Sequence, residues 1–339
     1  MVSPTAGIDL HAHFVPVEAL RAAGWATGAG GPVRVRVSTG WQAVPPALLD
    51  PGAVVSSAGA ANLAVRVCSL PPFLLRHDLP VHDGIAYSRA MNDGLAAAAT
   101  SMGNRVRMLA TVPLQAPQDA VEELRRAAGD LGFAGVEIAT NVAGTVELDD
   151  PALEPFWSSV ETLRMFVLIH PHDVAGAARM QAYHLRNLVG NPVETTLAAA
   201  RLIFGGVLSR HPDLTVVLSH GGGALPWLAG RIEQGYRVRP ECRTVESPPS
   251  AWLRRFVYDT VLFAPHAVRA LVEWVGADRV VLGTDYPFDM GDTDPIGTVT
   301  AALSDPQACD AVLAANAARL LALTGNSQDR LSRATPEAS

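Results

Sequence analysis

The sequence predicts an α/β fold in which eight parallel strands, alternating with helices, close into a (β/α)8 barrel of the TIM type. Short apolar runs rich in Val, Ile and Leu alternate with amphipathic stretches along most of the 339 residues. With 49% hydrophobic residues, a chain of this length can build the core of one barrel. A doubly wound sheet is disfavoured because the first run leads into His-Ala-His-Phe-Val-Pro, where such a sheet would carry a glycine-rich nucleotide turn.

The expected strands are largely apolar runs, as parallel strands buried on both faces require. They span 7–14, 63–70, 107–112, 134–140, 165–170, 214–220, 256–261 and 279–286. Between them, apolar residues recur at helical spacing, which predicts helices over 85–99, 117–131, 152–162, 192–209, 224–234 and 266–275.

Residues 1–325 are expected to form one domain. The stretch 22–54 is rich in Gly and Pro around a short alternating piece, and we interpret it as a small insertion after the first strand that folds over the barrel mouth. Residues 326–339 are polar and without pattern, and are expected to form a mobile C-terminal tail.

Charge and composition exclude several classes of partner. The net charge of −7 argues against nucleic acid or an anionic membrane surface. No run of about 18 uncharged apolar residues predicts a membrane span. Cys68, Cys242 and Cys309 are too scattered for a disulfide framework or a thiolate zinc site. Together with an N-terminus that lacks a signal-peptide pattern, these features favour a cytoplasmic protein.

All 26 basic residues are arginine, because the sequence contains no lysine. A GC-rich genome that favours arginine codons accounts for this bias without a functional cause. Chemistry that needs a lysine amine is nevertheless excluded within the chain, including Schiff bases, lysine-anchored pyridoxal phosphate, the P-loop and a lysine-carbamate bridge between two metal ions.

Polar residues end several of the expected strands. His11 and His13 alternate at the end of the first strand, so both imidazoles face the barrel interior. His170, His220 and Asp285 each follow an apolar run, at the strand ends where barrel enzymes carry their catalytic groups. Any one of them alone would be read as a strand-end cap or a surface residue. Four strands ending in this way predict a metal-centred active site.

The set His11, His13, His170 and Asp285 suits Zn²⁺ and also accommodates Mn²⁺, Fe²⁺ or Co²⁺. Because no lysine can supply a carbamate bridge, we expect one ion. His220 is left as the nearby acid or base, since an imidazole titrates in the working pH range.

These positions resemble those of the amidohydrolase superfamily. Four stretches narrow the resemblance to its decarboxylase branch: Thr-Val-Pro-Leu-Gln-Ala-Pro at 111–117, Leu-Gly-Phe-Ala-Gly-Val at 131–136, Ser-His-Gly-Gly-Gly-Ala at 219–224 and Gly-Thr-Asp-Tyr-Pro-Phe at 283–288. Within that branch, the sequence from about residue 108 to 288 is most similar to the 2-amino-3-carboxymuconate-6-semialdehyde decarboxylases.

The resemblance implies a barrel of the metal-dependent hydrolase type with one zinc ion on His11, His13, His170 and Asp285, and His220 as the acid–base residue. It implies no organic cofactor.

The resemblance also implies two arginines that bind substrate carboxylates, for which planar and permanently charged guanidinium groups are suited. One is Arg36, or Arg34 if the alignment slips by two, in the insertion. The other is Arg239, which would reach into the pocket of a neighbouring subunit, so a homodimer is expected. Alternatively, these arginines are surface residues or salt-bridge partners.

Phe288 and His172 are assigned to the substrate pocket. The family has Trp where this chain has His172, and an aromatic residue where it has Asn187, which predicts a more polar pocket. His172 is interpreted as a lining residue, with an extra proton donor as the alternative.

The resulting hypothesis is a metal-dependent, non-oxidative decarboxylase, a carbon–carbon lyase, that acts on a small unsaturated or aromatic carboxylic acid. The alternatives are a hydroxybenzoate-type decarboxylase, a hydrolase of a lactone or amide that uses the same site, and a metal-binding scaffold or inactive paralogue with a partner-binding role. The sequence leaves the particular substrate and the native metal open.

Overall fold

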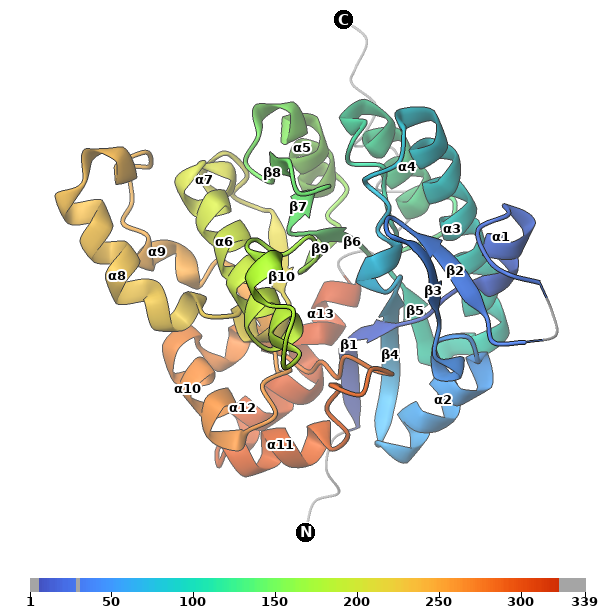
Figure 1. The fold of residues 1–339 in the computed structure, drawn as a ribbon. Helices are drawn as coiled ribbons and strands as arrows, with labels where there is room; N and C mark the ends of the chain where they lie inside the picture. The colour runs from blue at the N-terminus through green and yellow to red at the C-terminus, as the bar shows by residue number, and fades with distance from the viewer. Residues whose placement is uncertain (1–5, 29–30, 323–339) are drawn as a thin grey trace, which may run out of the picture.

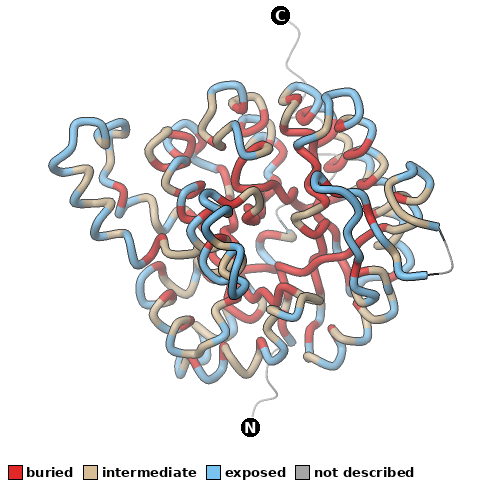
Figure 2. The backbone as a smooth tube through the Cα atoms, viewed as in Figure 1, coloured by how far each residue is buried: buried red, intermediate tan, exposed pale blue. Residues whose placement is uncertain are grey.

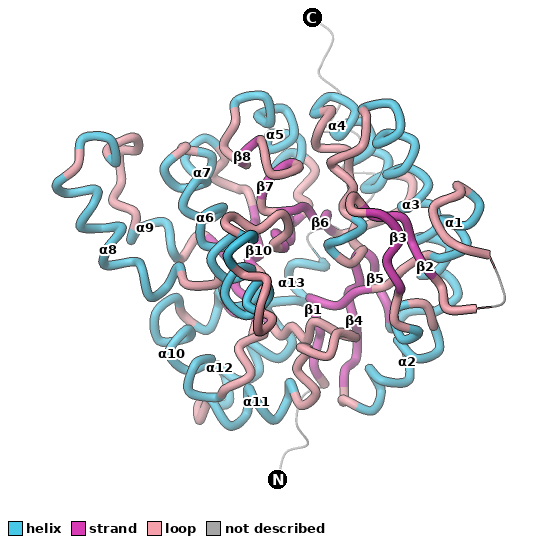
Figure 3. The backbone as a smooth tube through the Cα atoms, viewed as in Figure 1, coloured by secondary structure: helices cyan, strands magenta, loops and turns pink. Residues whose placement is uncertain are grey.

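The computed structural model describes residues 6–28 and 31–322; the expected tail, 326–339, lies outside them. Within these residues, eight parallel strands stand at the centre and helices surround them (Figure 1, Figure 3). The strands are β1 (Gly7–His13), β4 (Leu63–Ser69), β5 (Val106–Met108), β6 (Gly135–Ala139), β9 (Phe166–His170), β10 (Thr215–Leu218), β11 (Phe256–Asp259) and β12 (Val280–Val281). All eight lie where the apolar runs predicted strands.

The strands form two sheets, in the orders β1-β4-β5 and β12-β11-β10-β9-β6. Two parallel bridges join the sheets, Ala110 with Val136 on one side and Ala12 with Tyr286 on the other. Across the second join, the His13 amide donates to the carbonyl of Tyr286 at 2.7 Å. The two sheets therefore close into one ring, and the predicted (β/α)8 barrel is confirmed.

The helices form the outer layer of the barrel. They are α1 (Val17–Ala22), α2 (Pro51–Ala60), α3 (Val81–Met102), α4 (Pro117–Gly129), α5 (Glu154–Thr162), α6 (Asn191–Phe204), α7 (Val207–Arg210), α8 (Leu225–Val238), α9 (Ser250–Leu253), α10 (Pro265–Val275), α11 (Pro295–Ala302), α12 (Pro306–Asp310) and α13 (Asn316–Ala322). In α10, for example, Val268, Leu271 and Val275 are buried at helical spacing. Each of the six expected helices corresponds to an observed helix or, over 192–209, to the pair α6 and α7.

The core has two layers, and the buried residues gather around the central strands (Figure 2). Outward-facing strand residues pack against the helices. Inward-facing residues fill the half of the barrel that is away from the carboxyl ends of the strands. The inner layer includes Leu10, Val67, Leu109, Leu168, Val217, Val257 and Val281, with Ala317 and Leu320 of α13 beneath it. This apolar plug leaves the carboxyl ends of the strands as the place where polar side chains meet.

A bulge in β1 sets the direction of its histidines. The register pairs Asp9 with Arg66 and Ala12 with Cys68, so Leu10 and His11 together oppose the single residue Val67. Because of this extra residue, Leu10 joins the inner apolar layer while His11 and His13 still face the barrel interior above it.

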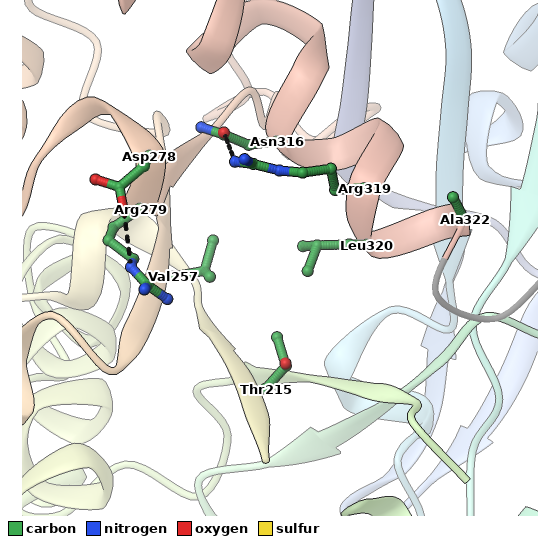
Figure 4. Close-up of a pocket in the computed structure, with 8 residues that line it drawn as sticks. All are labelled: Thr215, Val257, Asp278, Arg279, Asn316, Arg319, Leu320 and Ala322. Atoms are coloured by element: carbon green, nitrogen blue, oxygen red, sulfur yellow. Dashed lines mark hydrogen bonds and ion pairs between the residues drawn. The ribbon is translucent and has the colours of Figure 1, made fainter. Parts of the chain in front are cut away.

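A cavity of about 530 Å³ lies at the end of the barrel opposite the carboxyl ends of the strands (Figure 4). It opens beside α13 and is lined by Thr215 and Val257 at the starts of two strands, with Arg279 and Arg319 around it. Arg279 is paired with Asp278 at 3.2 Å. Stability, and not chemistry, is the usual role of this face in barrel enzymes.

Within 22–54, β2 (Arg34–Val37) and β3 (Gly40–Ala43) form an antiparallel hairpin, and the last residues belong to α2. The interpretation of the whole stretch as an insertion over the barrel mouth stays a prediction. Among the residues that the structure describes, none of the helices has both the length and the apolar character needed to span a bilayer.

Candidate metal centre

Three imidazoles and one carboxylate meet at the carboxyl ends of the strands. One ligand atom from each of His11, His170, His220 and Asp285 lies within 4.8 Å of the other three. His13 completes the group, because its Nε2 lies 3.2 Å from Nε2 of His11 and 3.1 Å from Oδ1 of Asp285. The five residues singled out from the strand ends are therefore brought together.

His11, His13 and His170 are each oriented by a bond that leaves one ring nitrogen for the centre. His11 Nδ1 is 2.6 Å from Oδ2 of Asp259, and His13 Nδ1 is 3.2 Å from the carbonyl of Leu70. His170 Nδ1 is 3.1 Å from the carbonyl of Pro171. In all three residues it is Nε2 that remains for the centre, the arrangement by which proteins fix the tautomer of a metal-binding histidine.

The His11–Asp259 bond needs a glycine between these two residues. Asp259 ends β11 and His11 lies in β1, with Gly283, after β12, between these strands. A Cβ at position 283 would lie 3.0 Å from the Cβ of Asp259 and 3.1 Å from that of His11. The other carboxylate oxygen of Asp259 accepts the amide of Gly221 at 2.8 Å, so this one residue also fixes the turn that carries His220.

Two of the site residues have a backbone conformation that side chains rarely adopt. His220 has φ of 54° and Asp285 has φ of 58°, both in the left-handed region. The turn at Asp285 is held from below, because the hydroxyl of Thr284 donates to Asp9 at 2.6 Å and Asp9 is paired with buried Arg66 at 2.9 Å. Strain of this kind is typical of functional sites in a rigid frame.

Burial and neighbouring charges set the protonation of the group. Burial opposes the charge on His11, but the bond to Asp259 and the carboxylate of Asp285 outweigh it and raise its pKa to about 9. Burial and the surrounding imidazoles hold the pKa of His170 well below its usual value. Although burial opposes it, hydrogen bonds from His13 and His220 hold the pKa of Asp285 well below its ordinary range. The group thus contains a neutral imidazole beside a carboxylate anion.

The donors fit a divalent ion. His170 Nε2 is buried without a hydrogen-bond partner among the described residues, and an unpartnered buried nitrogen is costly unless it donates its lone pair to a cation. Imidazole nitrogen and carboxylate oxygen are ligands that suit Zn²⁺, Mn²⁺, Fe²⁺ and Co²⁺.

The group opens into a pocket of about 290 Å³. Its lining comprises Asn187, Leu188, Asn191, Pro192, His220, Gly223, Val261, Leu262, Phe263, Asp285 and Met290. Most of this wall is apolar, with two asparagine amides as neutral polar groups. Asn187, the residue expected to make the pocket more polar, is one of them.

The residues that were expected to bind substrate lie outside the lining of this pocket, and each has different neighbours. The ring of Phe288 is 5.2 Å from that of His13, and His172 lies 3.8 Å from Asp173 with its side chain 20% exposed. Arg36 is exposed, with its guanidinium 5.4 Å from the ring of Trp25, while Arg34 donates to the carbonyl of Trp41 at 2.7 Å. Arg239, at the end of α8, is 65% exposed and 2.7 Å from Glu241. None of these five lines the pocket of about 290 Å³.

Asp259 and Glu137 were not singled out from the sequence. Asp259 carries the same signal as the others, a polar residue that ends an apolar strand. Glu137 carries a different one, a charged residue within the apolar run of β6. Both side chains are buried in the barrel beside the histidines.

Comparison with known proteins shows the family to which this chain is related. Residues 8–323 match the model of the amidohydrolase family. The chain is 36% identical over 248 residues to a 2-amino-3-carboxymuconate-6-semialdehyde decarboxylase of Dictyostelium discoideum, with 73% of this chain and 69% of the relative covered. It is 32% identical over 227 residues to a gamma-resorcylate decarboxylase of Rhodococcus jostii, with 60% and 67% covered.

A solved structure has the same fold: a dihydroxybenzoic acid decarboxylase of a Polaromonas species with bound manganese and an inhibitor. Its TM-score to this chain is 0.79 at 22% identity, with 94% of this chain and 97% of that chain covered. The barrel, the strand-end histidines and aspartate, and the family match over most of the chain lead to one conclusion: the chain belongs to the amidohydrolase family.

Proposed function

We propose that the protein is a metal-dependent, non-oxidative decarboxylase, a carboxy-lyase, of a small unsaturated or aromatic carboxylic acid. The observation that carries this proposal is the buried group of histidines and Asp285 at the base of a pocket of about 290 Å³ with largely apolar walls. A pocket of this kind suits a small planar acid. The two relatives described above, which are named decarboxylases, support the same reaction class.

In this proposal, His11, His13, His170 and Asp285 hold one divalent ion, for which Zn²⁺ is our first choice. When bound, such an ion supplies a Lewis acid that polarises a substrate oxygen and lowers the pKa of a water molecule to about 7. The chain itself supplies the position of the substrate, the exclusion of water by the apolar wall, and a proton.

His220 is the proposed acid–base residue. It lines the pocket, and its Nε2 lies 3.6 Å from Asp285 Oδ2, so its ring is placed where it could exchange a proton with a bound substrate. His220 delivers its proton to the carbon that bears the substrate carboxylate. The new C–H bond takes an electron pair from the conjugated system of the substrate. The bond between that carbon and the carboxylate then breaks, carbon dioxide leaves, and the electron pair of the broken bond re-forms the conjugated system.

The product identifies the reaction. Incubation of the metal-loaded protein with 2-amino-3-carboxymuconate-6-semialdehyde, and with a panel of hydroxybenzoates, should release one carbon dioxide per substrate, measured by mass spectrometry. A parallel panel of lactones and amides should give no acid. Release of acid without carbon dioxide would replace the decarboxylase by a hydrolase. Preference for the hydroxybenzoates would place the chain with the aromatic acid decarboxylases.

We further propose that the active unit is a homodimer, in which Arg239 reaches the pocket of the partner subunit. Three features support this. Arg239 is largely exposed. Helix α8 buries only Leu225 and Pro226 within the chain and projects from the barrel (Figure 1, Figure 2). Trp227 and Trp274 are exposed and contact each other with tilted rings, whose centres are 5.2 Å apart. Arg36 is the proposed second carboxylate-binding arginine.

A mixture of two inactive variants tests the shared pocket. Arg239→Ala and His220→Ala, after subunit exchange, form heterodimers in which one pocket has both wild-type residues. Random pairing should restore about a quarter of the wild-type activity. Exchange is checked first with differently tagged chains. If exchange is complete and no activity returns, Arg239 does not act across the interface.

The setting that we propose is cytoplasmic. Cys68, Cys242 and Cys309 are free thiols, as a reducing compartment allows. The net charge of −7 argues against nucleic acid or an anionic membrane as a partner. The partner that we propose is a small-molecule carboxylate substrate.

A further inference from the structure

Two asparagine amides line the pocket of about 290 Å³ without bonding to the rest of the chain. Asn187 lies in η6 (Arg186–Gly190), a π-helical turn, and Asn191 is the first residue of α6, directly after it. Both side chains are half-buried. Among the residues that the structure describes, no group hydrogen-bonds to either side-chain amide. Both amides are therefore available to a molecule in the pocket, and single π-helical turns of this kind are frequent at functional sites.

The buried asparagines of the described residues are treated differently. Asn92, Asn141 and Asn316 each donate their side-chain amide to at least two acceptors of the chain. This is the usual state of a buried amide, because a polar group that is removed from water without a hydrogen bond costs free energy. A substrate that covers Asn187 and Asn191 must therefore supply their hydrogen bonds itself.

The charge of the pocket indicates what kind of group can supply those bonds. Apart from His220 and Asp285, the described residues that line it are uncharged and include no arginine, and the sequence has no lysine. An asparagine side chain offers donors and an acceptor but no positive charge. A carboxylate placed against this wall would lose its water without gaining a cation, whereas a hydroxyl or amino group would be fully bonded.

An aromatic ring lies in the same pocket. Phe263 lines it, and its side chain is 50% exposed. Its backbone φ is 61°, which a bulky residue rarely adopts, so the loop after β11 holds this ring in place against its local preference. An exposed aromatic face suits a planar substrate, which can stack on it.

The helix that carries Asn191 is fixed to the turn that carries His220. The hydroxyl of Thr196 donates to the carbonyl of Pro192 at 2.7 Å and accepts the amide of Ala224 at 2.8 Å. Gly223, with φ of 64°, permits this close approach, because a Cβ there would clash with the carbonyl of Pro192. The fold therefore sets the distance between the asparagine wall and the proposed acid–base residue.

We propose that Asn187 and Asn191 form a specificity-determining subsite that binds a neutral hydrogen-bonding substituent, a hydroxyl or an amino group, on a planar substrate. This inference rests on the proposed function, because it concerns the same pocket. While the carboxylate that is lost lies at the histidine group, the two amides select what the rest of the molecule carries. They favour a neutral polar substituent over an apolar group and over a second carboxylate.

The test compares matched acids. Dihydroxybenzoates with one hydroxyl next to the carboxylate are paired with hydroxymethylbenzoates, in which a methyl group of similar size replaces the second hydroxyl. For at least one isomer, the kcat/KM of wild type should be about tenfold or more higher with the second hydroxyl than with the methyl. The acid with a second carboxylate in that place should be the poorest of the three.

Asn187→Leu and Asn191→Leu should lose this preference, because each keeps the bulk of the side chain but removes its amide. Their kcat/KM for the methyl acid and their metal content should stay close to those of wild type. Where leucine lowers the melting temperature, alanine at the same position removes the amide without adding apolar bulk.

Asn104→Leu is the matched control. Asn104 lies in η3 (Gly103–Arg105), directly before β5, and is exposed at the end of the barrel away from the pocket. The same change there should leave the preference for the hydroxyl as large as in wild type.

The outcomes separate this inference from the proposed function. If wild type releases carbon dioxide from none of these acids nor from the semialdehyde acid, the proposed function fails. If it releases carbon dioxide but treats hydroxyl and methyl alike, or accepts only dicarboxylic acids, the subsite alone fails. Leucine variants that keep the wild-type preference would also overturn it. A lower melting temperature in both the leucine and the alanine variants would assign the two asparagines a structural role instead.

Discussion

Asp285→Ala should yield a folded protein that holds no divalent ion and has no measurable decarboxylase activity. Asp285 is the carboxylate on which the histidines converge, since its oxygens lie 3.1 Å from His13 Nε2, 3.5 Å from His11 Nε2 and 3.6 Å from His220 Nε2. Without it, neutral imidazoles alone would have to hold the charge of the ion. Elemental analysis should find about one ion per wild-type chain and almost none in the variant. His11→Ala should behave in the same way.

Asp278→Ala is the control for this prediction. Asp278 lies just before β12, the strand that Asp285 follows. Its side chain is 49% exposed and pairs with Arg254 at the opposite end of the barrel. Its replacement should leave metal content and turnover near those of wild type. A wild-type protein with no metal or with two ions per chain would contradict the site, as would an Asp285→Ala variant that keeps its ion.

The strands and the helices that pack against them could be predicted because the signal is local. A parallel strand buried on both faces must be apolar along its length, and a helix that covers it must be apolar on one side. Helix α2 was not predicted, because its sequence Pro-Gly-Ala-Val-Val-Ser-Ser-Ala-Gly-Ala has no clear apolar face. Its start at Pro51 is fixed instead by the N-cap residue Asp50, whose carboxylate accepts the amides of Gly52 and Ala53.

In the site, only the residues that have a signal within their own strand could be predicted from the sequence. His11, His13, His170, His220 and Asp285 each have a local signal, a polar residue where an apolar strand ends. The bond between His11 and Asp259 joins residues 248 positions apart, and depends on Gly283 leaving room between them. The β1 bulge depends on the register with β4. Such features arise from how strands meet, so a single strand carries no sign of them.

The surroundings of Arg239 and Arg36 could not be predicted for the same reason, because they also depend on how distant parts of the protein meet. A sequence indicates that a guanidinium group is present and charged, but not which surface it faces. Within one chain, Arg239 is paired with Glu241, and Arg36 is stacked near Trp25. Their proposed role therefore depends on a partner subunit, for Arg239, and on bound substrate, for Arg36, which is why the mixed-variant experiment is more informative than either substitution alone.

His220→Asn should lower kcat by about 10²-fold to 10⁴-fold, the usual contribution of a general acid or base, while the ion stays bound. Asparagine keeps a polar group at the wall of the pocket but cannot exchange a proton at neutral pH. His11, His13, His170 and Asp285 remain to hold the ion, so metal content should stay close to that of wild type. Turnover and elemental analysis are measured on the same preparation.

His266→Asn, at an exposed histidine near the start of α10, is the matched control and should change neither quantity. The comparison separates two roles that the geometry alone allows, because a ligand atom of His220 also lies within 4.8 Å of those of His11, His170 and Asp285. A base that is not a ligand loses turnover alone. If His220→Asn loses its ion as completely as Asp285→Ala, His220 is a ligand, and the proton must come from another group at the pocket.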